Sequence, residues 1–284
     1  MTTQPSRRGI PEPPDPLPIP VVDNHTHLDM NREGLEVSVD DLAPVLAAGA
    51  AVGVDRVVQV GCDVPGARFA VEAAERYAGV LAGVALHPNE VPGLVADGRL
   101  DAAYTEIERL AAHPRVRVVG ETGLDYYRTG PDGVPAQQDS FRWHIDLAKR
   151  LGKALQVHDR DSHDDVLRVL AEEGAPERTV MHCFSGGPDL ARECVARGYH
   201  LSFSGTVTFK SAKVLRDALT QTPLELLLVE TDAPYLTPHP WRGAPNSPEL
   251  VPLTVRAMAA VLGVAVPTLC EALSENAERL YGPW

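Results

Sequence analysis

The stretch VVDNHTHLD, residues 21–29, decides between two parallel architectures that this chain could adopt. Its apolar start predicts a β-strand over residues 21–28, and His25 and His27 stand where that strand ends. An open doubly wound sheet would place a glycine-rich phosphate loop at this position. The histidines favour instead a parallel barrel, which gathers the C-terminal ends of its strands at one mouth.

Apolar runs continue along the chain and alternate with helical patterns. Strands are predicted at residues 21–28, 54–61, 80–87, 116–123, 154–158, 178–183, 200–204 and 226–232. Most runs are continuous rather than alternating, as is typical of parallel strands covered by helices. Helical patterns are predicted at residues 40–53, 65–78, 137–152, 162–174, 187–198, 247–263 and 266–282. One unbroken alternation of this kind predicts an α/β fold, a (β/α)₈ TIM barrel, as a single domain over residues 21–284.

Residues 1–20 and the bulk composition set limits on the class of protein. The first 20 residues are proline-rich, lack the apolar core of a secretory signal and are expected to form a flexible leader outside the barrel. The four cysteines show no CxxC spacing, so a cytoplasmic location is expected. The net charge of −13 argues against broad attraction to nucleic acid or anionic membranes. We expect no membrane span and no obligate protein partner.

Six metal-competent side chains stand at the ends of predicted strands, and a barrel would bring them to one mouth. They are His25, His27, Glu121, His158, His182 and Asp232. Four imidazoles and two carboxylates are too many ligands for one tetrahedral ion with an open position. The set therefore predicts two divalent ions, Zn²⁺, Mn²⁺ or Mg²⁺, in a hydrolytic centre.

Two of the six side chains are also predicted to take part in catalysis. Glu121, on the strand opposite the first one, is the expected carboxylate bridge between the two ions. Asp232 is expected to complete one ion and to accept the proton of a metal-activated water. Side-chain alternation along a strand predicts further that Asp23 shares a face with His25 and His27.

Other residues near the predicted mouth are candidates for substrate binding. His87 could contact a phosphate oxygen, although backbone caps before Pro88 would also explain it. Arg160 could grip a phosphate with both arms of its guanidinium. Tyr127, like its neighbour Tyr126, could stack on a base, and packing of the loop is an equally good explanation. Glu230 shares the inward face with Asp232 but lies deeper, where we expect it to support a ligand.

Several longer motifs around these residues resemble the TatD family of metal-dependent deoxyribonucleases, within the amidohydrolase superfamily. The motifs are GVALHP around His87, GETGLDYY at 120–127, HDRD at 158–161, HCFSG at 182–186 and ETDAPYL at 230–236. The resemblance covers residues 21–282 and implies a barrel, divalent metals and hydrolysis of DNA, often as a 3′-exonuclease. In WRGAPNSP at 241–248, Arg242 and Asn246 match the family, whereas Ala244 and Pro245 depart from it.

Two other functions remain open from the residues alone. An amide or ester hydrolase acting on a small molecule or an aminoacyl-tRNA would use the same metal ligands. Such an enzyme would be expected to have a closed apolar pocket, whereas a phosphodiesterase would have an open groove with cations such as Arg160 and Arg242. A non-catalytic scaffold barrel is disfavoured because it would have no need of all six ligands.

Overall fold

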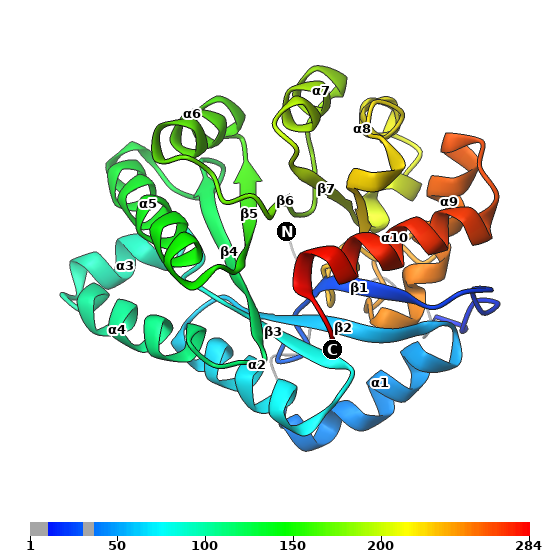
Figure 1. Ribbon diagram of the computed structural model, residues 1–284, viewed down its shortest axis with the longest axis horizontal. Coiled ribbons are helices and arrows are strands. Elements are labelled where there is room, and N and C mark those ends of the chain that lie inside the picture. The colour runs from blue at the N-terminus through cyan, green and yellow to red at the C-terminus, as the bar shows by residue number, and fades with distance from the viewer. Residues whose placement is uncertain (1–10, 31–36) are drawn as a thin grey trace, which may run out of the picture.

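The computed structural model describes residues 11–30 and 37–284, and within them the chain forms an eight-stranded parallel barrel (Figure 1). The strands are β1 (Val21–Thr26), β2 (Val54–Gly61), β3 (Val80–Val84), β4 (Val116–Asp125), β5 (Ala154–Arg160), β6 (Thr179–Met181), β7 (His200–Phe203) and β8 (Leu227–Val229). Neighbours in the barrel are neighbours in sequence. The segment after β8 returns to β1, since the Asp232 amide donates to the His25 carbonyl at 3.0 Å. The predicted TIM barrel is confirmed.

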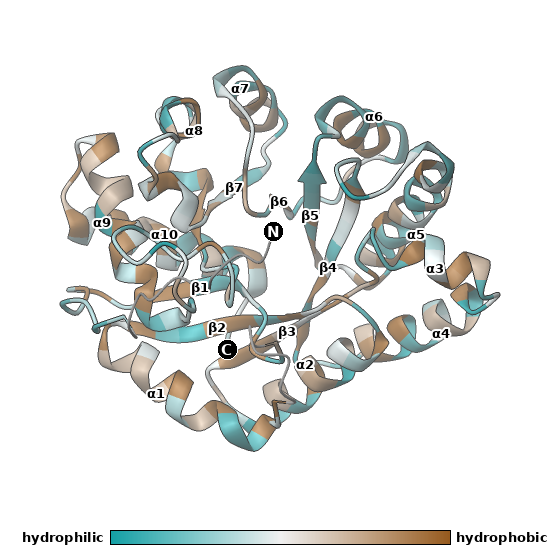
Figure 2. Ribbon diagram, turned by 180° about the vertical axis from the view of Figure 1, so that it is seen from behind, coloured by the Kyte–Doolittle hydropathy of each residue, from teal (hydrophilic) through white to brown (hydrophobic). Residues whose placement is uncertain are grey.

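Helices cover the outside of this barrel. They are α1 (Leu42–Ala51), α2 (Val64–Arg76), α3 (Val91–Ala96), α4 (Leu100–Ala111), α5 (Val134–Leu151), α6 (His163–Glu173), α7 (Pro188–Ala196), α8 (Lys213–Leu219), α9 (Val251–Leu262) and α10 (Val266–Tyr281). Of these, α3, α4 and α8 lie outside the predicted helical patterns. In Figure 2 the helices carry both hydrophilic and hydrophobic segments, as expected for elements with one face on a core.

The interior of the barrel is filled by one side chain or more from most strands. The inner apolar cluster contains Val22, Val58, Val60, Leu81, Val118, Ala154, Val180 and Leu228. Helix α10 adds Ala277, Leu280 and Tyr281 to this cluster and thereby closes the floor of the barrel. Apolar side chains therefore cover both the inner and the outer face of the strands. This leaves the C-terminal ends of the strands as the place where polar side chains can gather.

Residues 11–20 lie against the barrel. Leu17 is buried, and its amide donates to the Val52 carbonyl at 2.9 Å. The Arg256 guanidinium on α9 donates to the carbonyls of Asp15 and Pro16 at 2.8 and 3.1 Å. Residues 1–10 of the predicted leader lie outside the described residues.

Within the described residues, no single helix is long and apolar enough to cross a membrane. One pair bent by 112°, residues 248–262 and 266–281, meets the requirement by length and composition only.

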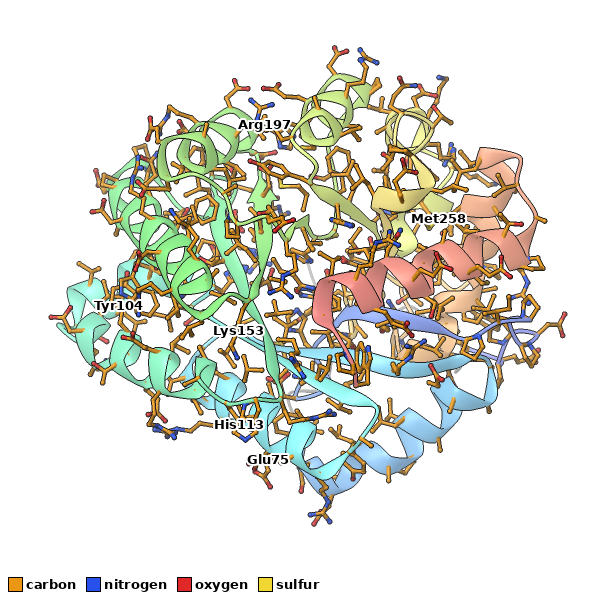
Figure 3. The ribbon with its side chains drawn as sticks, in the orientation of Figure 1. Glu75, Tyr104, His113, Lys153, Arg197 and Met258 are labelled. Atoms are coloured by element: carbon orange, nitrogen blue, oxygen red, sulfur yellow. The ribbon has the colours of Figure 1, made fainter. Side chains whose placement is uncertain are left out.

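Aromatic side chains pack together between two helices of the outer layer. Tyr104 of α4 (labelled in Figure 3) stacks on Trp143 of α5, with ring centroids 4.0 Å apart. The next residue of α5, His144, is buried beside them. Its Nε2 accepts a hydrogen bond from the Leu86 amide at 3.1 Å, and its Nδ1 lies 2.8 Å from the Ser140 carbonyl. These bonds require a neutral ring.

His144 is expected to make stability fall in mild acid. Burial lowers the pKa of His144 from 6.5 to about 4, so the unfolded chain binds this proton first. Its stabilising contribution is complete above the unfolded pKa and is lost as pH falls from 6.5 toward 4, by about 2 kcal/mol at pH 5. Urea unfolding of the wild type and of His144→Gln at pH 7.5 and 5 measures this. The variant should lose about 2 kcal/mol less between the two pH values, and an equal loss in both proteins would contradict the prediction.

Candidate metal centre

The six predicted ligands converge at the C-terminal mouth of the barrel around the Glu121 carboxylate. Glu121 Oε2 lies 2.7 Å from His182 Nε2 and 3.1 Å from His158 Nδ1. Its other oxygen, Oε1, lies 3.4 Å from His27 Nε2 and 3.9 Å from His25 Nε2. Each oxygen of one carboxylate thus faces a different pair of imidazoles. This is the arrangement expected of a carboxylate shared by two ions.

Asp232 is the second carboxylate beside the two β1 histidines, His25 and His27. Its Oδ1 lies 3.4 Å from His27 Nε2 and 4.0 Å from His25 Nε2. Asp232 lies three residues beyond the end of β8 and has a positive φ of 54°. Its side chain is 17% exposed, whereas that of Glu121 is 5% exposed. Of the two carboxylates, Asp232 is the one with access to solvent.

The tautomers of His25 and His27 show that the pair fits a cation. His25 Nδ1 lies 2.9 Å from Gln156 Oε1, and His27 Nδ1 lies 2.8 Å from the Val60 carbonyl. Because both partners are acceptors, each Nδ1 carries the proton and each Nε2 presents a lone pair. The two Nε2 atoms lie 3.2 Å apart, so in the neutral rings both lone pairs are within reach of one cation. Burial and the neighbouring His182 lower the pKa of His25 well below its ordinary value, whereas Cys62 and Asp232 outweigh burial and raise the pKa of His27 well above its ordinary value.

Gln156 is itself fixed by a polar network that reaches the floor of the barrel. Gln156 Nε2 donates to the Asn24 backbone carbonyl at 2.8 Å and to the Tyr281 hydroxyl at 3.0 Å. Tyr281 donates in turn to Asn24 Oδ1. With its amide nitrogen committed to these acceptors, Gln156 has only its oxygen to offer His25. Helix α10 therefore holds the tautomer of a ligand at the opposite end of the barrel.

Two further carboxylates stand behind the second pair of histidines. Asp125 Oδ2 lies 3.3 Å from His158 Nε2, and Glu230 Oε1 lies 3.3 Å from His182 Nδ1. Carboxylates behind imidazole ligands orient the rings and raise their basicity. Glu230 lies where it was expected from the sequence, one layer below Asp232. Glu230 also accepts from Asn24 Nδ2 at 3.3 Å, which joins it to the network below.

The charge state of Glu121 is set by its neighbours. Burial by itself raises the pKa of this carboxyl, but the His182 and His87 imidazoles outweigh burial and hold the pKa well below its ordinary value. The same interaction raises the pKa of His182, against the effect of its burial. A buried anion that draws positive charge onto its neighbours is the electrostatic environment that a divalent cation requires.

Irregular strand register places two of the ligands. The β1–β2 pairing shifts between Asp23 and Thr26, and the β4–β5 pairing shifts between Val119 and Thr122. On β1, Asn24 lies in the interior network while Asp23 accepts from Thr231 Oγ1 at 2.6 Å. The expectation that Asp23 shares a face with both histidines is therefore wrong, because regular alternation does not hold across the shift.

Close approach of β4 to β5 explains the glycine before Glu121. A Cβ atom at Gly120 would lie 2.7 Å from the Gln156 Cβ and 2.9 Å from the Gln156 carbonyl oxygen. Any larger residue would push the two strands apart at the point where Gln156 meets His25. Gly120 thereby keeps the Glu121 carboxylate in reach of both pairs of histidines.

Of the three predicted substrate-binding residues, His87 lies beside the centre, whereas Arg160 and Tyr127 contact each other at the ends of the neighbouring strands β5 and β4. His87 Nε2 lies 3.9 Å from Glu121 Oε2, and its ring meets that of His158 edge-on at 4.5 Å. The Arg160 guanidinium stacks over the Tyr127 ring at 3.9 Å, so these two residues form one platform. Tyr127 is 65% exposed, which leaves its other face open to solvent.

Several residues without a predicted function also lie at the centre. Cys62, at the end of β2, donates to Glu121 Oε1 at 3.3 Å and lies 3.7 Å from His27 Nδ1. Burial raises the pKa of the Cys62 thiol to about 12, so it is a neutral donor. Cys62 could have been identified as a site residue from the sequence, because it follows a predicted strand. No sequence feature would have identified Gln156 or Tyr281.

Comparison with known proteins gives a consistent match over the barrel. A model of a family described as TatD related DNase matches residues 22–282. A Mycobacterium tuberculosis relative, named an uncharacterized metal-dependent hydrolase TatD, is 48% identical over 266 residues, which cover 92% of this chain and 98% of the relative.

Solved structures match as well. The crystal structure of YJJV, a TatD homologue from Escherichia coli K12, superposes with a TM-score of 0.82 at 27% identity, over 92% of this chain and 97% of that one. A TatD family hydrolase from Entamoeba histolytica superposes with the same TM-score at 19% identity, over 94% and 100% of the two chains. Because the sequence identity to the Entamoeba histolytica protein is low, this second match supports the fold alone.

Proposed function

The chain belongs to the TatD related DNase family and is a metal-dependent hydrolase, and from this premise we propose that it hydrolyses the phosphodiester bonds of DNA as a 3′-exonuclease. The observation that supports the chemistry most directly is the Glu121 carboxylate between two pairs of imidazoles. The family description supports the choice of DNA.

We assign two divalent ions to this centre, with Zn²⁺, Mn²⁺ and Mg²⁺ as candidates. His25, His27 and Asp232 would hold one ion, His158 and His182 the other, and Glu121 would contact both. Bound divalent ions acidify water and stabilise negative charge that develops on a phosphate. His25 and His27 offer Nε2 lone pairs because their Nδ1 atoms are committed to carbonyl oxygens.

Asp232 is the residue that we assign to proton transfer. Its carboxylate is close to His27 and has access to solvent, so it can accept a proton from a water that attacks at the mouth. Glu121 is buried and surrounded by imidazoles, and its carboxylate therefore serves as a fixed negative charge. The two carboxylates differ in role because they differ in exposure.

Arg160, Tyr127 and His87 are assigned to substrate binding. The Arg160–Tyr127 platform offers a cation for a phosphate and an aromatic face for a base. His87 lies beside Glu121 and His158, where it can contact an oxygen of the scissile group.

Arg160→Ala is expected to raise KM for DNA by about 10- to 100-fold, since a charge-assisted hydrogen bond contributes about 1.5–3 kcal/mol, and to change kcat little. Steady-state kinetics on end-labelled single-stranded DNA measure both constants. Arg168→Ala is the matched control, because Arg168 pairs with Asp165 and Glu172 on the outer helix α6. A fall in kcat with unchanged KM would remove Arg160 from the binding role.

The function is tested by screening metal-loaded protein against end-labelled single- and double-stranded DNA, RNA, and a panel of N-acyl and ester substrates. Release of mononucleotides from the 3′ end is the expected result. If no nucleotides are released and an N-acyl or ester substrate is cleaved in an Asp232-dependent reaction, the amide or ester hydrolase takes the place of the nuclease.

A further inference from the structure

A recess opens on the rim of the barrel, between the loops that follow β7 and β8. It has a volume of about 390 Å³ and is lined by Phe209, Lys210, Ser211, His239, Pro240 and Arg242. In a parallel barrel, these two loops lie at the same end as the metal ligands. The loop after β8 begins next to Asp232, and Figure 1 shows α8, which follows the other loop, beside β7.

The walls of this recess are held by hydrogen bonds from inside the protein. The Arg216 guanidinium on α8 donates to the Phe209 carbonyl at 2.6 Å and to the Lys210 carbonyl at 3.2 Å. The His239 amide donates to Thr208 Oγ1 at 2.8 Å and so ties one loop to the other. The recess is thus a formed feature whose two walls are fixed relative to each other.

Among the described residues that line the recess, those that carry a full charge are cations. Lys210 and Arg242 are both exposed, and none of the six lining residues is acidic, although the net charge of the chain is −13. The Arg242 guanidinium lies over the Phe209 ring at 4.5 Å, which restrains the side chain at the recess. A restrained guanidinium, an ammonium and an imidazole around one hollow suit a phosphate group.

We propose that this recess binds a backbone phosphate of a nucleic-acid strand, away from the phosphodiester that is hydrolysed at the Glu121 centre. The inference rests on the proposed nuclease function and adds to it. The Arg160–Tyr127 platform stands on β5 and the loop after β4, on the other side of the mouth from the loops after β7 and β8. A strand lying across the mouth meets cations on both sides of the metal centre.

Phosphate contacts at both the platform and the recess would make binding depend on the length of the substrate. An oligonucleotide long enough to span the mouth can contact the platform, the centre and the recess together, whereas a diester with one phosphate contacts only one of them. Binding energy from the recess therefore favours strands over small diesters. It also gives an acidic protein a local means of holding a polyanion.

The test compares Lys210→Gln, Arg242→Gln and the double variant with the wild type. Binding of fluorescent oligothymidylate is measured by anisotropy in EDTA over a range of salt, and hydrolysis of bis(p-nitrophenyl) phosphate is measured with metal. The slope of log Kd against log salt should fall by about 0.7 for each phosphate that the variant no longer neutralises, and affinity should fall by about tenfold in the double variant. Hydrolysis of the small diester should stay unchanged.

Lys213→Gln is the matched control, since Lys213 pairs with Asp217 on α8 and does not line the recess. Unchanged DNA affinity and salt slope in the double variant, or equal losses in the control, would overturn the recess as a phosphate site. Wild-type protein that hydrolyses neither DNA nor the small diester would instead overturn the nuclease function itself. The single variants keep the test valid should the double variant fail to fold.

Discussion

Asp232→Asn is expected to lower kcat for DNA hydrolysis by about 10²–10⁴-fold, the usual contribution of a positioned general base. The amide keeps the size of the side chain and one oxygen near His27, but it cannot accept a proton. Metal content and DNA affinity should therefore fall much less than turnover. Single-turnover kinetics, together with elemental analysis of the same preparation, separate the two effects.

Asp189→Asn controls for the loss of a carboxylate, because the Asp189 side chain is 93% exposed on α7. If Asp232→Asn keeps near-wild-type turnover with full metal content, another group accepts the proton. If the Asp232→Asn variant loses its metal together with its activity, the result shows a role of Asp232 in metal binding and does not support its role as a general base.

Glu121→Gln is expected to weaken the binding of both ions, whereas His25→Ala should weaken one of them. The amide has nearly the shape of the carboxylate but lacks the negative charge that faces four imidazoles. An ion that binds the folded state raises its stability by RT ln(1 + [L]/Kd). The rise in melting temperature on adding metal should therefore nearly vanish in Glu121→Gln and persist in reduced form in His25→Ala.

Metal-free protein provides the control for this comparison. Because the imidazoles hold the buried Glu121 carboxyl in its charged form, Glu121→Gln should also lower the stability of the metal-free protein. The rise on adding metal is therefore measured for each protein from its own metal-free melting temperature. A metal-bound structure in which the Glu121 carboxylate touches neither ion would also contradict the bridging assignment.

The barrel and its six candidate ligands followed from the sequence because both depend on local patterns. Strand ends in a parallel barrel share one mouth, so a polar residue directly after an apolar run is placed by topology alone. His158, His182 and Asp232 are of this kind, and they lie at or just beyond the ends of β5, β6 and β8.

Features that depend on register or on distant partners could not be predicted in this way. Asp23 was misplaced because a shift in β1 breaks the alternation that the pattern assumed. Gln156 occupies an interior strand position and reads as an interruption of an apolar run, until the fold brings His25 against it. The recess at Lys210 and Arg242 joins two loops that carry no common motif, so it becomes visible only when the loops are side by side.

The network beneath His25 has a consequence for the order in which the protein matures. Gln156 is held in part by Tyr281, the final residue of the last helix, more than 100 residues further along the chain. During synthesis, all six candidate ligands leave the ribosome before this helix does. An ion captured early meets a His25 ring whose orientation is not yet set. The finished binding geometry is therefore a late product of folding, completed when the last helix docks on the floor of the barrel.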